Sequence, residues 1–281
     1  MKEPIILNGK TTAQKIRANW KETIGLYQIH PCLAIVSVGT DPASAVYVRN
    51  KIKACEEVGV ATRHLTLNED ASEYEVISTI DHLAQDKTVH GIILQLPLPK
   101  HLVPEYILPH IPPEKDVDGF RHDSLFQPCT PKGILRLLDT YSLTDRLDGS
   151  HCVVIGRSNI VGKPLAKMLL DYNATVSMCH SHTTQSDLYK LINNADFVFS
   201  AVGQPGFIGP WAIDHFGITM VDIGINRDIE GKLCGDFNPE CYEMSYAYTP
   251  GPGGIGPMTV AMLIENTVIA CMAQEGVQPM C

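Results

Sequence analysis

The chain has 281 residues, of which 44% are hydrophobic and 19% are charged. A chain of this length and composition can bury a substantial core and suits one large α/β domain or two ordinary ones. Its net charge of −9 provides no basic surface, so we expect neither nucleic acid nor an anionic membrane among its partners.

Two series of alternating strands and helices follow one another along the chain. In the first, strands at Cys32–Val38, Val60–Leu67 and Val89–Leu94 alternate with helices at Pro42–Val58 and Ser72–Asp86. Strands that alternate with helices form parallel sheets, and ligands bind beyond the carboxyl ends of those strands. We therefore predict an α/β fold.

The second series follows the proline-rich and irregular stretch 94–127. It opens with a helix after Thr130-Pro131, and its last helix covers about residues 257–274. Four strands are expected between these helices, near residues 152–156, 174–179, 196–202 and 218–223.

The segment CVVIGRSNIVGKP at 152–164 predicts a nucleotide site. Gly156 allows a tight turn after a short apolar strand, Gly162 permits close backbone approach, and Pro164 suits the first turn of a helix. Such a corner presents backbone N–H groups and the positive end of a helix dipole to a pyrophosphate. Because Ser158 replaces the second glycine of the common G-x-G-x-x-G pattern, an ordinary strand–turn–helix corner is the alternative.

The end of the following strand indicates which dinucleotide binds. An NAD site usually has an acidic residue there for the ribose hydroxyls, whereas this chain has His180, Ser181, His182 and Thr183. Arg157 lies in the glycine turn, and a cation with hydroxyl donors suits a 2′-phosphate. We therefore predict NADP in preference to NAD.

His180 and His182 could form a metal pair, but no H-E-x-x-H motif is present, and we expect no metal site.

Tyr47 and Lys51 are candidate catalytic residues. They lie four residues apart in a predicted helix, so they share one face, where the two side chains can hydrogen-bond. A lysine withdrawn from water can exchange a proton near neutral pH. An amphipathic surface pair is the alternative, and Lys53 on a different face is the comparison.

Two polar residues near the end of the first series are candidate ligand contacts. Gln95 ends the strand GIILQ and is followed by Leu-Pro-Leu-Pro, which directs an amide beyond a buried strand. Asp118 in KDVDGF can bind paired N–H donors such as an amidine-like ring edge. A surface-loop glutamine and a turn-forming aspartate are the alternatives.

The segment PGPGGIGP at 250–257 has four glycines and three prolines. This much glycine lets the backbone approach a flat ligand closely. An inter-domain linker is the alternative, but a predicted strand before it and a helix after it favour a binding loop. Pro252, Gly253 and Gly254 are its candidate substrate contacts.

Cellular location is indicated by the cysteines and the apolar runs. The nine cysteines are odd in number and lack C-x-x-C spacing, which favours reduced thiols in the cytoplasm. No apolar run approaches the roughly 20 residues of a membrane span, and the apolar run after Pro4 is too short for a signal peptide.

Eight segments occur in the order of one known family. They are ASAVYVRNKIKACEEVG (43–59), GIILQLPLP (91–99), KDVDGF (115–120), PCTPKGI (128–134), VVIGRSNIVGKP (153–164), ATVSMCHSHT (174–183), VDIGIN (221–226) and PGGIGPMTVAML (252–263). Through these eight segments together, the chain resembles the bifunctional methylenetetrahydrofolate dehydrogenase/cyclohydrolase family of the FolD type. Each segment alone is weakly specific, but the set covers most of the chain.

The resemblance implies two α/β domains with the active site in the cleft between them. Residues 1–118 would form an N-terminal folate-binding catalytic domain, onto which the C-terminal helix at about 257–281 packs back. Residues 119–256 would form a Rossmann-like NADP-binding domain with a parallel sheet. The resemblance also implies a cytoplasmic homodimer that binds tetrahydrofolate derivatives and serves one-carbon metabolism, including purine, histidine and methionine biosynthesis.

Individual site residues follow from the same resemblance. Lys51 matches the catalytic lysine, Tyr47 the active-site tyrosine that stacks on or hydrogen-bonds the folate, and Gln95 the glutamine that supports the lysine. Asp118 matches the carboxylate that holds the pterin ring. The positions that match NADP contacts are Gly156, Arg157, Ser158, Ser181 and Ile225.

Two segments depart from the family pattern. Only RHDSLFQ at 121–127 stands where the family usually has a longer connection with an N-x-G-x-L pattern, which affects the domain hinge and one wall of the cleft. CGDF at 234–237 stands where the family often reads GDV, and we expect an effect on local packing alone.

The implied reaction has two steps. NADP⁺ takes a hydride from the one-carbon bridge of 5,10-methylenetetrahydrofolate, and water then opens the methenyl product to 10-formyltetrahydrofolate, with Lys51 as proton shuttle. Another NADP-dependent α/β dehydrogenase would explain the nucleotide site but would leave four residues without a shared role: Tyr47, Lys51, Gln95 and Asp118. A non-catalytic dinucleotide sensor would be expected to lack the lysine. NADPH formation with methylenetetrahydrofolate separates these three functions.

Overall fold

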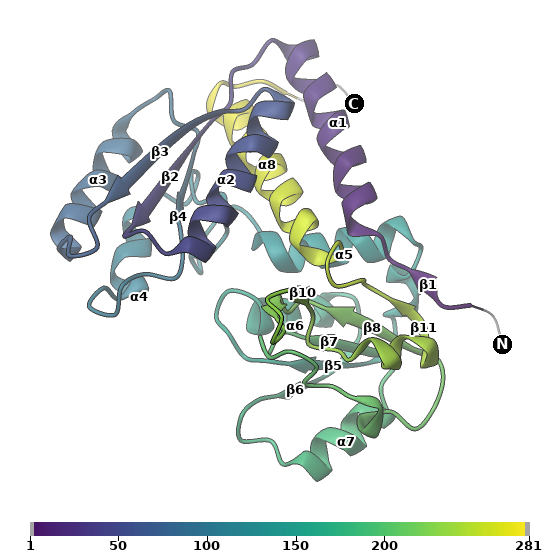
Figure 1. Cartoon of the computed structure of the whole chain (residues 1–281). Helices are drawn as coiled ribbons and strands as arrows, with labels where there is room; N and C mark the ends of the chain where they lie inside the picture. Colours follow the sequence, from purple (N-terminus) through teal and green to yellow (C-terminus); the bar gives the residue numbers. More distant parts are fainter. Residues whose placement is uncertain (1–2, 279–281) are drawn as a thin grey trace. The chain divides into compact units, whose positions relative to one another are not determined.

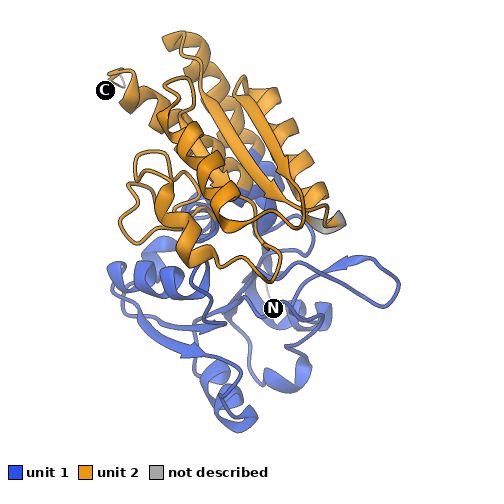
Figure 2. Cartoon of the chain, turned by 90° about the vertical axis from the view of Figure 1, so that its left-hand side faces the viewer, with its two compact units in different colours: residues 1–13, 130–259 blue, residues 14–129, 260–281 orange. Residues whose placement is uncertain are grey.

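The computed structural model describes residues 3–278 (Figure 1). Contacts within the chain divide it into two compact units, coloured separately in Figure 2. Unit 1 comprises the residues up to 13 and 130–259, and unit 2 comprises 14–129 and the residues from 260. The chain passes from one unit to the other within the helices α1 (Gly9–Tyr27), α5 (Cys129–Thr140) and α8 (Ile255–Gln274).

Unit 2 is built on a three-stranded parallel sheet in the order β3-β2-β4. The central strand β2 (Cys32–Val38) pairs with β3 (Ala61–Leu67) along its whole length and with β4 (Gly91–Leu94) on its other edge. Alternate residues of β2, beginning with Cys32, join the buried core with α3 and β4. Because helices flank such a sheet, the central strand is an almost continuous apolar run.

Helices α2 (Pro42–Val58) and α3 (Glu73–Gln85) connect these strands, and side chains cap their first turns. The Asp41 carboxylate accepts a hydrogen bond from Ser44 N at the start of α2. Ser72 and Glu75 form a capping box at the start of α3. These caps satisfy N–H groups that a helix leaves unpaired, so they set where each helix begins. The short helix α4 (Pro104–Ile107) follows β4.

Unit 1 is built on a six-stranded parallel sheet in the order β1-β11-β8-β7-β5-β6. Its strands are β1 (Ile5–Ile6), β5 (His151–Ile155), β6 (Thr175–Cys179), β7 (Phe197–Ser200), β8 (Ile218–Asp222) and β11 (Ser245–Tyr248). After β5 the chain runs outward to β6 through α6 (Gly162–Asp171), and then returns through α7 (Gln185–Asn193) to β7 on the other side of β5. This reversal creates a switch point beyond the carboxyl end of β5, where α/β sheets bind ligands.

A two-stranded antiparallel hairpin lies outside the large sheet of unit 1. It consists of β9 (Asn226–Arg227) and β10 (Leu233–Cys234). Ile229 at its tip is fully exposed, and Leu233 is 39% exposed.

Helix α8 corrects one expectation from the sequence. By length and composition it could cross a membrane, with a mean hydropathy of 1.5 over its most apolar window, whereas we expected no such stretch. However, 78% of that window is buried inside the protein. A helix that packs on all sides needs no polar face, so a core helix acquires the composition of a membrane span.

The strands and helices predicted with bounds are confirmed, with ends that differ by at most three residues; the largest difference is at α5, which begins at Cys129 and not after Pro131. No helix was predicted at α1, although Ala13, Ile16, Trp20, Ile24 and Tyr27 recur there at helical spacing, and the short elements β1, α4, β9 and β10 were not predicted either. The domain boundaries at 118 and 256 stay a prediction. Contacts group residues up to 13 with unit 1 and residues 119–129 with unit 2, which differs from the expected division.

Candidate active site

Lys51 and Gln95, two of the predicted catalytic residues, contact each other in unit 2. Lys51 Nζ donates a hydrogen bond to Gln95 Oε1 over 3.2 Å, and the two residues are only 5% and 9% exposed. The amide nitrogen of Gln95 donates to the carbonyl of Leu96 over 2.6 Å, which leaves Oε1 directed at the lysine. The amide therefore holds the lysine nitrogen at one position, as a proton-transfer group requires.

Helix α2 and the end of β4 place these side chains. Lys51 Nζ lies 5.9 Å from the centroid of the Tyr47 ring, one helical turn away, so the predicted shared face is confirmed. Gln95 continues the register of β4, because its N–H donates to the carbonyl of Val36 over 2.8 Å. A cis peptide bond follows between Leu96 and Pro97, where the chain leaves the sheet.

Tyr47 and Asp118 belong to the same cluster. Burial raises the pKa of Tyr47, and the negative charge of Asp118 raises it further. Asp118 is 7% exposed, and among the residues that the structure describes no donor reaches its carboxylate. We refer to Tyr47, Lys51, Gln95 and Asp118 as the α2–β4 cluster.

A pocket of about 510 Å³, including its open mouth, lies beside Gln95. Its lining includes Ser37 at the end of β2, Ser44 in the first turn of α2 and His64 on β3. His64 Nε2 lies 3.0 Å from Ser37 Oγ and 3.3 Å from Thr66 Oγ1. The pocket therefore offers hydroxyl and imidazole groups beside the amide.

The glycine turn after β5 has the geometry of a dinucleotide site. Gly156 has a φ of 117°, and a Cβ there would lie 2.5 Å from the carbonyl oxygen of Ala201. A Cβ at Gly162 would lie 2.0 Å from the carbonyl oxygen of Gly156. No other residue fits either position without moving the backbone, and this closeness keeps the strand end and the helix start together.

Ser158 explains how the turn forms without a second glycine. Its Oγ accepts hydrogen bonds from Val161 N at 3.1 Å and Gly162 N at 3.3 Å. The hydroxyl thus pairs two N–H groups at the start of α6, which we had expected to be unpaired. N–H groups nearer to Gly156 and the dipole of α6 remain the features that suit a pyrophosphate.

The remaining predicted cofactor contacts also lie at the carboxyl edge of the unit 1 sheet. Arg157 follows β5, Ser181 follows β6, and Ile225 follows β8; the first two are exposed, and Ile225 is 52% exposed. We refer to the loops after β5, β6, β7 and β8 as the cofactor edge. His180 Nδ1 accepts the N–H of His182 over 3.2 Å, so this nitrogen is engaged and does not favour a metal pair.

Pro252, Gly253 and Gly254 lie in unit 1, in the turn between β11 and α8. The N-terminal segment holds this turn. Lys10 N donates to the carbonyl of Gly253 over 2.9 Å, and a Cβ at Gly9 would lie 1.8 Å from the carbonyl oxygen of Gly254. The start of α1 therefore packs directly against the glycine-rich turn, a contact that the sequence of this segment did not indicate.

The shortened connection at 121–127 is anchored within unit 2. Arg121 pairs with Asp123 at 2.8 Å and also donates to the carbonyls of Pro109 and Ile111. Its backbone N–H donates to Asp116 over 2.9 Å. The short segment is therefore hydrogen-bonded to the same unit that carries the α2–β4 cluster.

Sequence patterns missed two buried carboxylates in unit 1. Asp236 is completely buried and Asp222 is 5% exposed. Burial raises the pKa of Asp222 to about 6, and the charge of Asp236 adds to this effect. Asp236 belongs to CGDF, for which we expected an effect on local packing alone; its hydrogen bonds to the cofactor edge show that its role extends further. The only sequence signal for Asp236 was that CGDF keeps the Gly-Asp pair of the family's GDV pattern.

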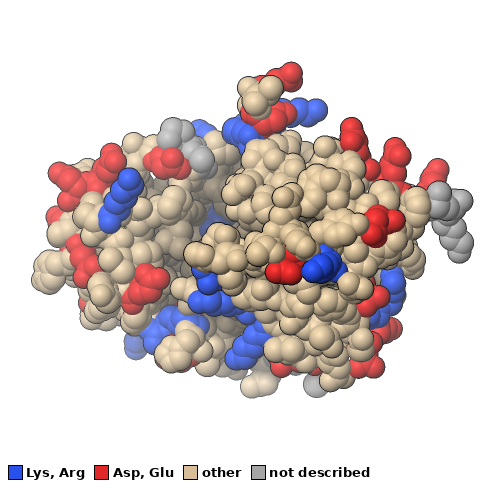
Figure 3. Space-filling view, turned by 90° about the horizontal axis from the view of Figure 1, so that it is seen from below, with Lys and Arg blue, Asp and Glu red and all other residues tan. Residues whose placement is uncertain are grey.

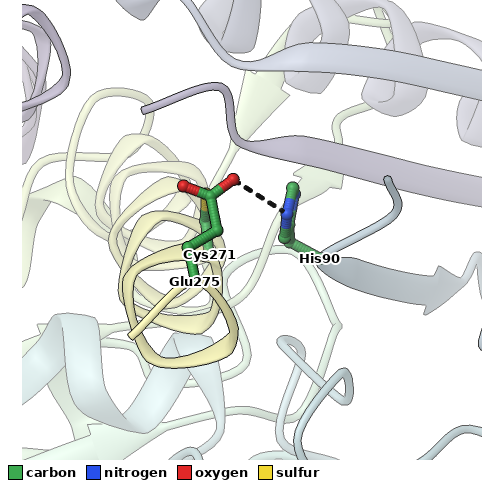
Figure 4. A group of neighbouring side chains, drawn as sticks. All are labelled: His90, Cys271 and Glu275. Atoms are coloured by element: carbon green, nitrogen blue, oxygen red, sulfur yellow. Dashed lines mark ion pairs between the residues drawn. The ribbon is translucent and has the colours of Figure 1, made fainter. Parts of the chain in front are cut away.

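A second cluster in unit 2 brings together three potential metal ligands, His90, Cys271 and Glu275 (Figure 4). Their ligand atoms lie within 4.8 Å of one another, and His90 Nε2 is 3.6 Å from Glu275 Oε1. However, Cys32 N donates to His90 Nδ1 over 3.2 Å, so the neutral ring carries its proton on Nε2. Burial also raises the pKa of Cys271 to about 12. A protonated Nε2 and a protonated thiol suit a hydrogen-bonded contact better than a metal centre.

The charge distribution is mixed. Figure 3 shows both acidic and basic side chains on the displayed face, and the chain has 31 acidic and 22 basic residues in all. Binding of an anionic ligand would therefore depend on local groups and not on a basic surface.

Two family models match the chain. The model of the tetrahydrofolate dehydrogenase/cyclohydrolase catalytic domain matches residues 7–118, and that of the NAD(P)-binding domain of the same family matches residues 128–275. Between them lies the shortened connection.

Individual relatives agree with this match. A bifunctional protein FolD from Magnetococcus marinus is 46% identical over an alignment that covers 94% of this chain and 95% of the relative. The crystal structure of a bifunctional FolD from Campylobacter jejuni is 41% identical, with a TM-score of 0.90 over 95% of this chain and 98% of that chain. A Trypanosoma brucei FolD solved with NADP cofactor and inhibitor is 28% identical, with a TM-score of 0.91 over 99% and 100% of the two chains.

Proposed function

Because the chain belongs to the tetrahydrofolate dehydrogenase/cyclohydrolase family, we propose that it is a bifunctional enzyme of one-carbon metabolism. It oxidises 5,10-methylenetetrahydrofolate with NADP⁺ and hydrolyses the resulting 5,10-methenyltetrahydrofolate to 10-formyltetrahydrofolate. The observation that carries the proposal is the buried hydrogen bond between Lys51 and Gln95. A sensor that only binds a dinucleotide needs no buried lysine.

The two reactions make different demands on the chain. In the first, the one-carbon bridge loses a hydride, for which bound NADP⁺ supplies the acceptor. In the second, water adds to the carbon of the cationic methenyl group and one carbon–nitrogen bond breaks. The water loses both of its protons: one reaches the released nitrogen, and the other leaves to solvent as the formyl group forms. The first reaction therefore depends on positioning, and the second depends on a group that moves protons.

Lys51 is the group that we assign to proton transfer. It takes one proton from the attacking water and gives it to the released nitrogen, while the second proton of that water leaves to solvent. Gln95 supports it, since its Oε1 accepts from Nζ and fixes where the lysine nitrogen lies. Tyr47 lies one turn away on the same helix face, where it contacts the folate beside the lysine.

Asp118 and the glycine-rich turn are assigned to substrate binding. The carboxylate of Asp118 is buried and can accept paired N–H donors from the pterin ring. Pro252, Gly253 and Gly254 present backbone without bulky side chains, which suits close approach to a flat ring.

The cofactor edge is assigned to NADP. The close backbone contacts of Gly156 and Gly162 form a cradle that a side chain would fill. Ser158 shapes the turn through its hydroxyl, Arg157 and Ser181 supply a cation and a hydroxyl for the 2′-phosphate, and Ile225 provides an apolar contact.

We further propose a cytoplasmic homodimer that binds neither nucleic acid nor membranes. Exposed Ile229 and Leu233 on the β9–β10 hairpin support a second copy as partner, because exposed apolar groups of this kind mark interfaces. The eight cysteines among residues 3–278 are all free, which supports a reducing compartment. Sedimentation of the purified protein tests the dimer.

The enzyme assay uses two substrates in separate reactions. The first supplies methylenetetrahydrofolate and NADP⁺ and follows NADPH formation; the second supplies methenyltetrahydrofolate alone and follows its disappearance. We expect activity in both. NADPH formation without accelerated hydrolysis would show that the protein is a dehydrogenase alone. The absence of both activities would refute the proposed bifunctional enzyme.

A further inference from the structure

Asp236 is a buried acceptor for donors from two loops of the cofactor edge. Its Oδ2 accepts from Ser200 Oγ at 2.9 Å and from Val202 N at 2.8 Å. Its Oδ1 accepts from Gly203 N at 3.1 Å, Gln204 N at 3.0 Å and Asn226 Nδ2 at 2.8 Å. One carboxylate thus pairs three successive backbone N–H groups after β7 and a side chain after β8.

The loop after β7 touches the glycine turn directly. Ala201 N donates to the carbonyl of Ile155 over 2.8 Å, and the carbonyl of Ala201 faces Gly156 so closely that a Cβ there would lie 2.5 Å away. The loop after β8 contains Ile225, immediately before the Asn226 that binds Asp236. Both loops held by Asp236 therefore adjoin proposed NADP contacts.

A carboxylate suits this position better than an amide. Five donors converge on two oxygens, and an ionised carboxylate offers only acceptors, whereas an amide would direct its own NH₂ at one of them. The space is also closed, because a Cβ at Gly224 would lie 2.0 Å from Asp236 Oδ1. A longer acidic side chain does not fit.

The neighbouring carboxylate acts on a different part of the chain. Asp222 accepts from the backbone N–H groups of Asp236 and Phe237, at 2.9 and 3.0 Å, and from the hydroxyl of Tyr242 at 3.3 Å. It therefore holds the segment that carries Asp236, and among the described residues its carboxylate accepts no hydrogen bond from the loop after β7.

We propose that Asp236 is a positioning residue for NADP: without touching the nucleotide, it holds the loops 201–204 and 224–226 in the arrangement that binds it. This inference rests on the proposed NADP-dependent function. A residue that only stabilises the fold would affect both reactions. Substitution of Asp236 should instead affect only the dehydrogenase reaction, which uses the nucleotide.

The test compares the two activities in Asp236→Asn, Ser200→Ala and the control Tyr242→Phe. Hydrolysis of methenyltetrahydrofolate supplied directly needs no nucleotide, so it reports on folding and on the α2–β4 cluster. For Asp236→Asn we expect the KM for NADP⁺ to rise about tenfold or more and the hydrolysis rate per molecule to stay within about twofold. Ser200 is completely buried and its hydroxyl donates to Asp236, so Ser200→Ala removes one of the five donors and should raise this KM about two- to fivefold.

Tyr242→Phe removes one hydrogen bond from Asp222 and leaves the loop after β7 unchanged, so its KM for NADP⁺ should equal that of the wild type. Equal losses of both activities in Asp236→Asn, or an unchanged KM, would overturn the positioning role. If Asp236→Asn does not fold, an unchanged KM in Ser200→Ala overturns it instead. A wild-type protein without NADPH formation would refute the proposed function itself, a result distinct from these.

Discussion

The α2–β4 cluster of unit 2 and the cofactor edge of unit 1 keep their functional groups in opposite environments. Lys51 and Asp118 are 5% and 7% exposed, whereas Arg157 and Ser181 are exposed. In the α2–β4 cluster, side-chain hydrogen bonds such as that from Lys51 to Gln95 hold the functional groups in place. At the cofactor edge, closely approaching backbone such as that of Gly156 forms the site, and side chains are added at its surface.

This difference follows from what each region has to do. A group that transfers protons must be held in one place and away from water, which requires a buried partner such as Gln95. A dinucleotide presents a charged backbone that N–H groups and a helix dipole can bind, so exposed side chains are needed only to choose between nucleotides. Substitutions in the first region should therefore change rates or folate affinity, and those in the second should change nucleotide use.

The largest effect is expected for Lys51→Ala. Loss of the proton-transfer group should lower hydrolysis of methenyltetrahydrofolate about 10²–10⁴-fold, while part of the dehydrogenase activity is retained. Lys53→Ala is the matched control, since Lys53 is exposed on a different face of the same helix. Steady-state assays of both activities measure the effect, and near-normal hydrolysis in Lys51→Ala would remove the lysine from this role.

Asp118→Ala should weaken folate binding and leave NADP binding unchanged. Removing an acceptor for charge-assisted hydrogen bonds costs about 1.5–3 kcal/mol, or roughly 10- to 100-fold in the dissociation constant. Titration with folate and with NADP⁺ separates the two ligands, and the exposed Asp70→Ala serves as control. An unchanged folate affinity would leave Asp118 as a turn residue.

Arg157→Ala and Ser181→Asp should shift nucleotide preference. The first removes a cation and the second places a negative charge where we expect the 2′-phosphate, so the ratio of NADP to NAD use should fall by about tenfold. Lys163→Ala, at an exposed lysine in the first turn of α6, should keep the parental ratio. If both site variants also keep it, the 2′-phosphate is bound elsewhere.

Asp222 predicts a pH effect on stability at the cofactor edge. Its pKa is raised from the ordinary 3.8 to about 6, mainly by burial, so the folded state binds the proton more tightly than the unfolded state. This contribution is present in full below pH 4 and is lost as the pH rises to about 6, with a span of about 3 kcal/mol.

Chemical unfolding of wild type and Asp222→Asn across this range checks the effect. The wild type should lose stability relative to Asp222→Asn as the pH rises from about 4 to 6, and the difference should level off above about 7. A constant difference over the whole range would contradict the raised pKa.

Local sequence was sufficient for the alternation of strands and helices, the glycine turn and the pairing of Tyr47 with Lys51. Each of these depends on neighbours within a few residues: period-2 and period-3.6 patterns, the special freedom of glycine, and the spacing of four along a helix. The resemblance to a family added roles for residues that local patterns left open, such as Gln95 and Asp118.

Tertiary structure decided what depends on residues distant in the sequence. Ser200 and Asp236 lie 36 positions apart, so no local pattern indicates that one carboxylate holds the loop after β7. The same holds for Gly9 against Gly254, and for the Cys32 N–H that sets which nitrogen of His90 carries the proton. A buried polar group has to find its partner wherever the fold brings one, and only the folded chain determines which partner that is.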